Sequence, residues 1–159
     1  MIRIMFVCHG NICRSPMAEF IMKRLAALAG VSDKIEIFSS ATSDEEIYHG
    51  VGNPIYPPAA RELSRRQIPY TPRRAVKLVP SMLDGFDMFV GMDSANIRNM
   101  HRILGSAAEG KISRLMDYTD RRGADVADPW YSGRFDVAFD DIFDGCQGLL
   151  KYLKGENLI

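Results

Sequence analysis

The run Ile2–Val7, with the sequence IRIMFV, is the feature that most limits what this chain can fold into. It is short and almost continuously apolar, which is typical of a β-strand covered on both faces. Such a strand needs helices above and below its sheet, so the run predicts a central strand of an α/β fold. A helix is predicted next, because apolar residues recur at helical spacing from Pro16, which suits the first helical position after Ser15, until Gly30 offers a stop.

The same alternation of strand and helix signals continues to the end of the chain, with no repeat and no low-complexity tract. Further strands are predicted at Ile35–Phe38, Asp87–Met92 and Lys111–Met116, and further helices at Pro57–Gln67, Ser94–Leu104 and Phe135–Leu153. Right-handed crossovers between these elements predict a single doubly wound open sheet of about four parallel strands, with helices on both faces. We expect one domain over residues 1–159, with its ligand site at the carboxyl ends of the strands.

Composition excludes several classes of partner. Twenty basic residues balance twenty acidic ones, so no net field favours nucleic acid or an anionic membrane. The apolar start is too short for a signal peptide, and no apolar run approaches the length of a membrane span. Three cysteines are too few for a disulfide framework, which predicts a reducing, cytoplasmic setting. His9, His49 and His101 are scattered, so neither a metal site nor a cofactor is expected.

The stretch CHGNICR, between the first strand and the first helix, carries the chemistry. It places the thiol of Cys8 and the guanidinium of Arg14 at the two ends of a loop with five residues between them. A loop of that length can turn its backbone N–H groups around a tetrahedral anion, while the helix N-terminus adds partial positive charge. Arg14 can grip two phosphate oxygens, and the same field favours a thiolate at Cys8. We therefore expect a phosphate site with a nucleophilic sulfur.

The stretch VCHGNICRSPMAE resembles the signature loop of the low-molecular-weight protein tyrosine phosphatases, which carry C-x5-R followed by Ser-Pro at the N-terminus. Far downstream, ADPWYSG (Ala127 to Gly133) resembles the loop of that family that carries the general acid. The segments SSATS and GMDSAN also look like the family, so the likeness covers essentially the whole chain.

The resemblance implies roles for three residues in the hydrolysis of phosphotyrosine in proteins. Cys8 would take the phosphoryl group as a phosphocysteine, and Arg14 with the loop amides, including those of His9, Gly10 and Cys13, would hold the phosphate oxygens. Asp128 would protonate the leaving phenolate and then deprotonate the attacking water. The partner would be a tyrosine-phosphorylated protein. The oligomeric state stays open, with a monomer favoured.

Supporting residues follow from the same likeness. Ser15 would donate a hydrogen bond to the Cys8 sulfur. Asn11 suits a left-handed backbone and would tie the loop to its neighbours, including Ser39. An aromatic slot would be walled by Ile12, Tyr48, Trp130 and Tyr131. Away from the slot, Asp93 and Asn96 are expected to cap the helix that follows them, and Cys146 to lie in the core.

The chain departs from the family pattern at three positions. Arg73 stands about where a histidine commonly braces the phosphate loop, and Val76 stands where an arginine is usual, so the bracing network is in doubt. The stretch from Asp44 to Pro58 is longer than its usual counterpart and has Tyr56 where an aspartate is expected. This stretch borders the cleft in the family, so the resemblance leaves open whether this chain prefers the same substrates.

Three other functions remain open. A phosphoarginine phosphatase shares the loop, but the resemblance associates threonine with that substrate where this chain has the apolar Ile12. An arsenate reductase needs additional cysteines near the third strand, and residues 79–92 contain none. A non-enzymatic anion-binding module would not need an acid such as Asp128. If Asp128 is not the acid, Asp125 and Asp136 are the next candidates.

Cys13 predicts redox control of Cys8. It lies on the same curled loop as Cys8, so a sulfenic acid formed at Cys8 would meet a second thiol and form a disulfide. The competing interpretation is that Cys13 only packs under the loop.

Overall fold

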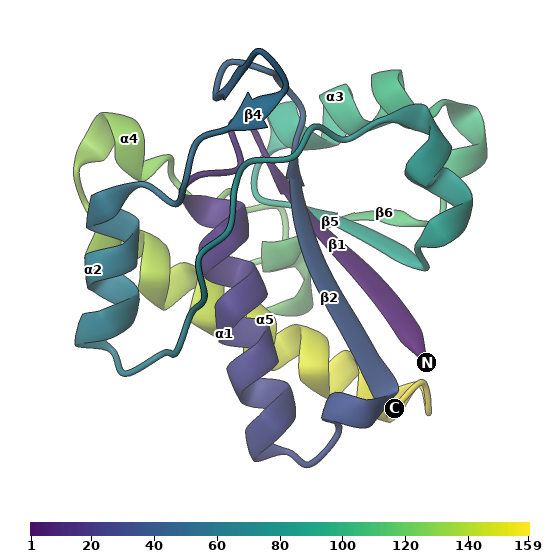
Figure 1. Ribbon diagram of the computed structural model, residues 1–159. Coiled ribbons are helices and arrows are strands. Elements are labelled where there is room, and N and C mark those ends of the chain that lie inside the picture. Colours follow the sequence, from purple (N-terminus) through teal and green to yellow (C-terminus); the bar gives the residue numbers. More distant parts are fainter.

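The computed structural model describes all residues, 1–159. Figure 1 shows its elements in chain order: β1 (Ile2–Cys8), α1 (Arg14–Leu28), β2 (Ile35–Ala41), β3 (Ile47–Tyr48), β4 (Val51–Gly52), α2 (Pro57–Arg65), β5 (Met88–Gly91), α3 (Ser94–Leu104), β6 (Ile112–Arg114), α4 (Pro129–Ser132) and α5 (Phe135–Gly155). Short 3-10 turns lie at Ser32–Lys34, Pro80–Gly85, Ser106–Ala108 and Leu115–Tyr118.

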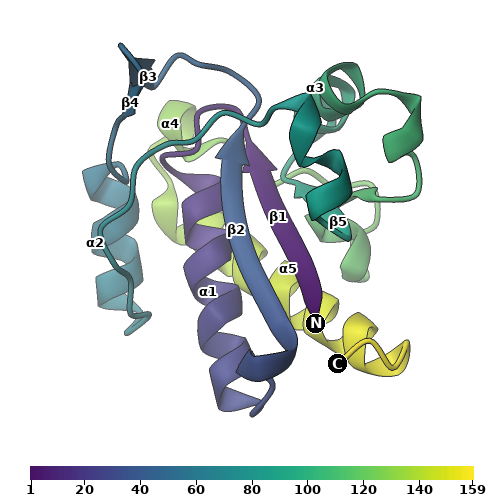
Figure 2. The ribbon, with the colours of Figure 1, turned by 45° about the vertical axis from the view of Figure 1, so that its right-hand side comes forward.

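Four strands form one parallel sheet in the order β2, β1, β5, β6, which confirms the predicted α/β fold. Helices α1, α2 and α5 lie on one side of the sheet and α3 lies on the other (Figures 1 and 2). The position of β1 between two hydrophobic cores explains its apolar sequence. Ile4 and Phe6 belong to the core cluster shared with α1 and α5, whereas Met5 and Val7 belong to the cluster shared with α3. The sheet is therefore buried on both faces.

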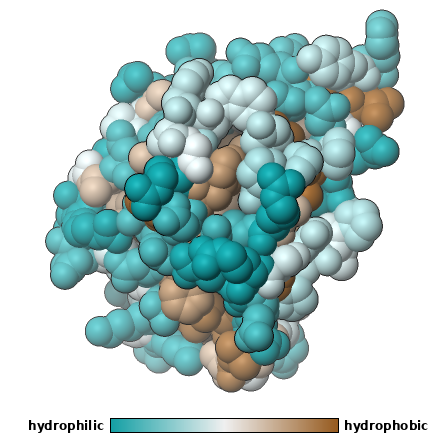
Figure 3. Space-filling model, turned by 90° about the vertical axis from the view of Figure 1, so that its left-hand side faces the viewer, coloured by the Kyte–Doolittle hydropathy of each residue, from teal (hydrophilic) through white to brown (hydrophobic).

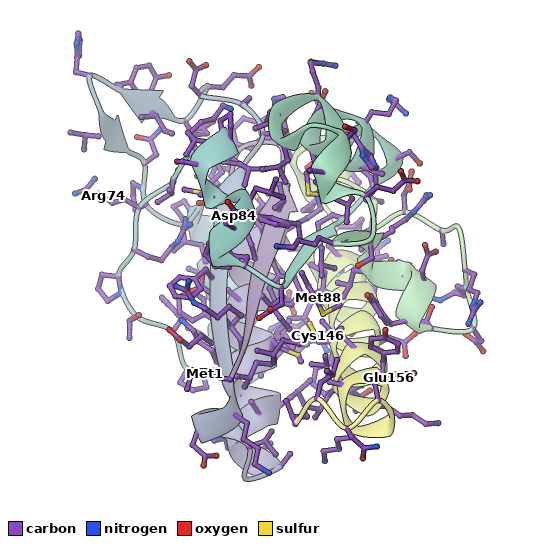
Figure 4. All side chains as sticks on the ribbon, turned by 90° about the vertical axis from the view of Figure 1, so that its right-hand side faces the viewer. Met1, Arg74, Asp84, Met88, Cys146 and Glu156 are labelled. Carbon is purple, nitrogen blue, oxygen red and sulfur yellow. The ribbon has the colours of Figure 1, made fainter.

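The predicted helices are present, with corrected ends. The first helix begins at Arg14, so Pro16 is its third residue and not its first. The missing N–H of proline costs little there, because the first four N–H groups of a helix have no partner within it. Gly30 follows the helix with a positive φ of 72°, as a C-terminal stop requires. Cys146, labelled on α5 in Figure 4, is fully buried as expected, and its Sγ lies 3.8 Å from the carbonyl oxygen of Ala18 in α1.

Three parts of the structure differ from the prediction. The stretch from Asp44 to Pro58, in which no strand was predicted, contains the small antiparallel hairpin β3–β4. The fourth strand is shorter than predicted, because the chain leaves the sheet after Arg114 and turns through Leu115–Tyr118. The loop Ala127 to Gly133, for which no helix was predicted, contains the one-turn helix α4.

Every helix is too short or too polar to span a membrane.

The helix α3 has the predicted bounds, and its start is fixed by a capping box. The side chain of Asp93 accepts from the backbone N–H of Asn96, and the Asn96 side chain accepts from the backbone N–H of Asp93. A close approach to the sheet follows, because a Cβ on Gly91 would lie 2.7 Å from the Cε of Met100. The start of α3, and with it Asp93, is thereby held against the carboxyl end of β5.

Candidate active site

The loop between β1 and α1 curls around the side chain of Cys8. Its sharpest point is Asn11, whose φ of 59° is the left-handed conformation that the sequence predicted. This conformation directs the backbone N–H of Asn11 toward Cys8 Sγ, at 3.3 Å. This loop amide therefore faces inward, as an anion site requires.

A second donor reaches the same sulfur. Ser15 Oγ lies 3.0 Å from Cys8 Sγ, and it accepts a 2.8 Å hydrogen bond from Asn11 Nδ2. The hydroxyl hydrogen has two acceptors within reach, Cys8 Sγ at 3.0 Å and the carbonyl oxygen of Ser40 at 3.5 Å, and a thiolate at Cys8 would draw it to the sulfur. The predicted contact between Ser15 and Cys8 is present, and it favours negative charge on the sulfur.

Arg14 is buried, with only 3% of its side chain exposed, and acidic groups surround it. Its Nη1 donates to Asp93 Oδ2 and to the carbonyl of Val126, both at 2.8 Å. Its Nη2 lies 3.5 Å from Asp128 Oδ2. Burial by itself lowers the pKa of Arg14, but the charges of Cys8, Asp93 and Asp128 outweigh burial and raise it. Asp93, expected only to cap α3, therefore also orients the guanidinium.

Asp128 lies at the start of α4, where its Oδ1 accepts a 3.0 Å hydrogen bond from the backbone N–H of Trp130. Its Oδ2 is the atom that faces Arg14. The side chain is 28% exposed, so it is reachable from solvent. Asp125 and Asp136, the alternative acids, are placed differently: Asp125 binds Ser94 and Arg114, and Asp136 pairs with the exposed Arg134.

Arg73 braces the phosphate loop, which resolves the doubt raised by the missing histidine. Its Nη1 donates to the carbonyl oxygen of Asn11, and its Nη2 donates to Asn11 Oδ1 and to Ser39 Oγ. A direct contact between Asn11 and Ser39 was expected. In the structure the two residues are instead linked through Arg73, which donates to both. Burial lowers the pKa of Arg73, and the charges of Glu19 and Cys8 partly oppose this effect. Val76 contributes its backbone N–H, which donates to Asn11 Oδ1 at 3.0 Å.

These side chains meet in a cavity of about 130 Å³ at the carboxyl ends of the strands. It is lined by Cys8, His9, Gly10, Ile12, Cys13, Arg14, Glu45, Glu46, Asp128, Trp130 and Tyr131. Figure 3 looks at the side that carries α2 and α4, and it shows a mostly hydrophilic surface with a hollow in its upper half where apolar side chains are visible. The cavity thus joins an anion-binding floor to partly apolar walls.

Tyr48 is the one predicted wall residue that does not line the cavity. It lies on β3 with 63% of its surface exposed. Glu45 and Glu46, which the sequence reasoning missed, take that side of the cavity instead. Their position a few residues after the second strand was the available signal, because parallel strands bring such segments to one edge of the sheet.

Tyr56 was also missed as a contributor to the site. Its ring centroid lies 4.7 Å from that of Trp130, and its backbone N–H donates to the carbonyl of Ile12 at 2.9 Å. It therefore supports two wall residues from behind. Trp130 and Tyr131 are 52% and 86% exposed, which places both at the rim.

All three cysteines are free thiols, and all are buried. Burial and the neighbouring charge of Cys8 raise the pKa of Cys13, so Cys13 is a neutral thiol beneath the loop. A disulfide between Cys8 and Cys13 stays a prediction.

Comparison with known proteins shows that nearly the whole chain is similar to one family of phosphatases. Residues 3–158 match the model of the family described as low molecular weight phosphotyrosine protein phosphatase. The chain is 38% identical to the low molecular weight protein-tyrosine-phosphatase YfkJ of Bacillus subtilis, with 98% of each chain covered. It is 33% identical to the protein-tyrosine-phosphatase PtpA of Staphylococcus epidermidis, covering 99% of this chain and 98% of the relative.

Solved structures agree. The crystal structure of YfkJ from Bacillus subtilis superposes with a TM-score of 0.91, covering 98% of this chain and 96% of that one at 36% identity. A structure of the YwlE arginine phosphatase, only 24% identical, shares the fold with a TM-score of 0.82 and covers 99% of this chain and 100% of its own. Because the family model matches residues 3–158 and a named relative is 38% identical over 98% of each chain, the chain belongs to the low molecular weight phosphotyrosine protein phosphatase family.

Proposed function

We propose that this enzyme hydrolyses phosphotyrosine in proteins through a phosphocysteine intermediate, with Cys8 as nucleophile, Arg14 as phosphate ligand and Asp128 as general acid and base. The observation that carries the proposal is the arrangement around one sulfur: Cys8 Sγ takes donors from Asn11 and Ser15 in a cavity that also holds Arg14 and Asp128.

In the first step, the Cys8 thiolate attacks phosphorus, the S–P bond forms and the P–O bond to the phenol breaks. Asp128 gives its proton to the departing oxygen. Arg14 and the loop amides balance the charge of the phosphoryl oxygens throughout, so the proposal needs no cofactor.

In the second step, water attacks phosphorus and gives its proton to the Asp128 carboxylate. The S–P bond then breaks and inorganic phosphate leaves. The hydroxyl of Ser15 stabilises the returning thiolate, because its hydrogen is available to the sulfur. We also infer that the enzyme works in a reducing compartment such as the cytoplasm, where Cys8 stays reduced.

Phosphotyrosine is the proposed substrate because of the cavity walls. Ile12, Trp130 and Tyr131 line it, and the apolar side chain of Ile12 suits a phenyl ring better than a charged guanidinium. Aromatic faces accept either group, and Glu45 and Glu46 on the other side of the cavity are the feature that would favour a guanidinium. Phosphoarginine is the alternative to exclude. The test compares matched peptides that carry phosphotyrosine, phosphoserine or phosphoarginine, and phosphotyrosine is expected to be hydrolysed fastest. Faster release of phosphate from phosphoarginine would overturn the substrate assignment.

The nucleophile is tested separately with Cys8→Ser. This change is expected to abolish turnover while phosphate-ester binding persists, because Arg14 and the loop remain. Near-normal turnover of para-nitrophenyl phosphate by this variant would show that another group attacks phosphorus.

A further inference from the structure

The segment that carries Asp128 has little regular structure to hold it. Between the turn at Leu115–Tyr118 and the short helix α4, the chain runs through residues 119–128 without helix or strand. Its position must therefore come from contacts that reach it from elsewhere.

A three-residue cluster, Arg114, Asp125 and Ser94, supplies such contacts. Arg114 Nη1 donates to Asp125 Oδ1 at 2.8 Å and to the carbonyl of Gly123 at 3.0 Å, both within the segment. The same nitrogen donates to Ser94 Oγ at 2.9 Å, at the start of α3. One guanidinium at the end of β6 thus joins the segment to a helix terminus.

Asp125 closes the connection from the other side. Its Oδ1 accepts from the backbone N–H of Ser94 at 3.1 Å and from Ser94 Oγ at 3.2 Å. The N–H groups in the first turn of a helix have no partner within the helix, so Asp125 acts as a cap supplied by a distant segment. This is the position next to Asp93, which orients Arg14.

The proposed acid, Asp128, lies only three residues after Asp125 in the chain. Val126, directly after Asp125, donates its N–H to the carbonyl of Met92 at 2.9 Å and accepts from Arg14 at 2.8 Å. Asp128 follows two residues later and faces Arg14. The distance between the acid and the phosphate ligand therefore depends on where residues 123–126 are held.

We infer that Arg114 and Asp125 are positioning residues for the general acid: they hold the segment so that Asp128 reaches the leaving-group oxygen. The inference rests on the proposed role of Asp128. Misplacement of a proton donor by about an ångström is costly for catalysis, and proton transfer is worth about a hundredfold to ten-thousandfold in rate. A looser segment should therefore lose part of that factor and leave phosphate binding intact.

The experiment measures kcat/KM of Arg114→Met and Asp125→Asn on phosphotyrosine and on an aryl phosphate with a highly activated leaving group, because kcat/KM reports phosphoryl transfer to Cys8, the step in which the leaving group departs. Both variants are expected to lose about tenfold in kcat/KM on phosphotyrosine and less than about threefold on the activated ester, while inhibition by inorganic phosphate stays near that of the parent. Arg114→Lys should recover part of the loss. Arg66→Met is the matched control, because Arg66 pairs with Glu62 of α2 and Asp140 of α5 and makes no ion pair with residues 119–128.

A double-mutant cycle separates positioning from general damage. In an Asp128→Asn background, Arg114→Met should change the rate by less than about twofold, because the group that it positions is already lost. Equal losses on both esters, or fully additive effects in the cycle, would overturn the positioning role alone. If Asp128→Asn itself lost equally on both esters, the assignment of the acid would fail, and the positioning role with it. Should Arg114→Met not fold, Asp125→Asn decides the same question.

Discussion

The guanidinium of Arg73 donates to both the backbone carbonyl and the side-chain oxygen of Asn11, the residue that bends the phosphate loop through a left-handed conformation. A non-glycine residue in that conformation stores strain, and it persists only where its surroundings enforce it. Arg73 is part of that enforcement, and it acts across 62 residues of sequence.

Replacing Arg73 with methionine should loosen the phosphate loop. Two acceptors on the fully buried Asn11 would lose donors, at a cost of about 1–3 kcal/mol in the free energy of unfolding. We expect kcat/KM on phosphotyrosine to fall at least about tenfold, since the amides that hold phosphate would no longer be aligned. Chemical denaturation and steady-state kinetics measure the two effects.

Arg74→Met is the control for that change. Arg74 donates to the carbonyl of Gly52 in strand β4 of the hairpin and not to the phosphate loop, and it is labelled at the edge of the molecule in Figure 4. Its loss should leave kcat/KM near the parent value. Similar activity losses in both variants would argue against a specific role for Arg73.

Asp128→Asn should show its effect through the leaving group. Loss of a general acid typically costs about a hundredfold to ten-thousandfold, and the cost is largest where the leaving oxygen most needs a proton. Phosphotyrosine should therefore suffer more than an activated aryl phosphate, as a series of aryl phosphates would measure. A small and equal loss along the series would return attention to Asp125 or Asp136.

Peroxide should oxidise Cys8 first, to a sulfenic acid, because Cys8 Sγ has donors from Asn11 and Ser15 that favour a thiolate, whereas the raised pKa of Cys13 keeps it a neutral thiol. Condensation with the Cys13 thiol would then release water and form a disulfide that dithiothreitol reverses. Cys13→Ser should consequently recover less activity than the parent after peroxide and dithiothreitol. Peptide mapping by mass spectrometry identifies the linkage, and Cys146→Ala serves as the control.

Equal recovery by the parent and Cys13→Ser, or an oxidised parent without a Cys8–Cys13 linkage, would leave Cys13 as packing only.

Alkaline pH should destabilise the fold through Cys146. Burial raises the pKa of this thiol above the ordinary value of 9.0, so the unfolded chain loses the proton at a lower pH than the folded protein does. The stability is therefore fully present below pH 9.0 and declines as the pH rises above it, by at most about 1.4 kcal/mol per pH unit for one group. Urea unfolding between pH 7 and 10.5 should show a shallower decline for Cys146→Ala than for the parent. Parallel curves would contradict the assignment.

The parts of the fold that the sequence predicted are those whose cause is local. The strand β1 is visible because its residues are buried on both faces, and α3 because Asp93 and Asn96 form its capping box. The hairpin β3–β4 has two residues in each strand, and it is held by distant partners such as Ala75, whose N–H donates to the carbonyl of Asn53 at 2.8 Å. Nothing within such short strands signals their pairing.

The site, too, has a part that could be predicted from local sequence and a part that depends on contacts between distant segments. The loop from Cys8 to Arg14 is one continuous stretch, so its spacing alone indicated an anion site. The support from Arg73 and the clustering of Arg114 with Ser94 and Asp125 depend on segments that only the folded sheet brings together. Tyr48 was misplaced for the same reason, since its direction is set by the hairpin.

Both ends of the chain lie at the amino edge of the sheet, opposite the cavity (Figure 1). Met1 and Leu158 even line one shallow groove there. The seven-residue strand β1 separates that edge from Cys8 by roughly 20 Å. An affinity tag, a fluorescent reporter or a surface linker joined to either terminus would therefore extend away from the mouth of the cavity, so the enzyme can be tethered while a protein substrate still approaches freely.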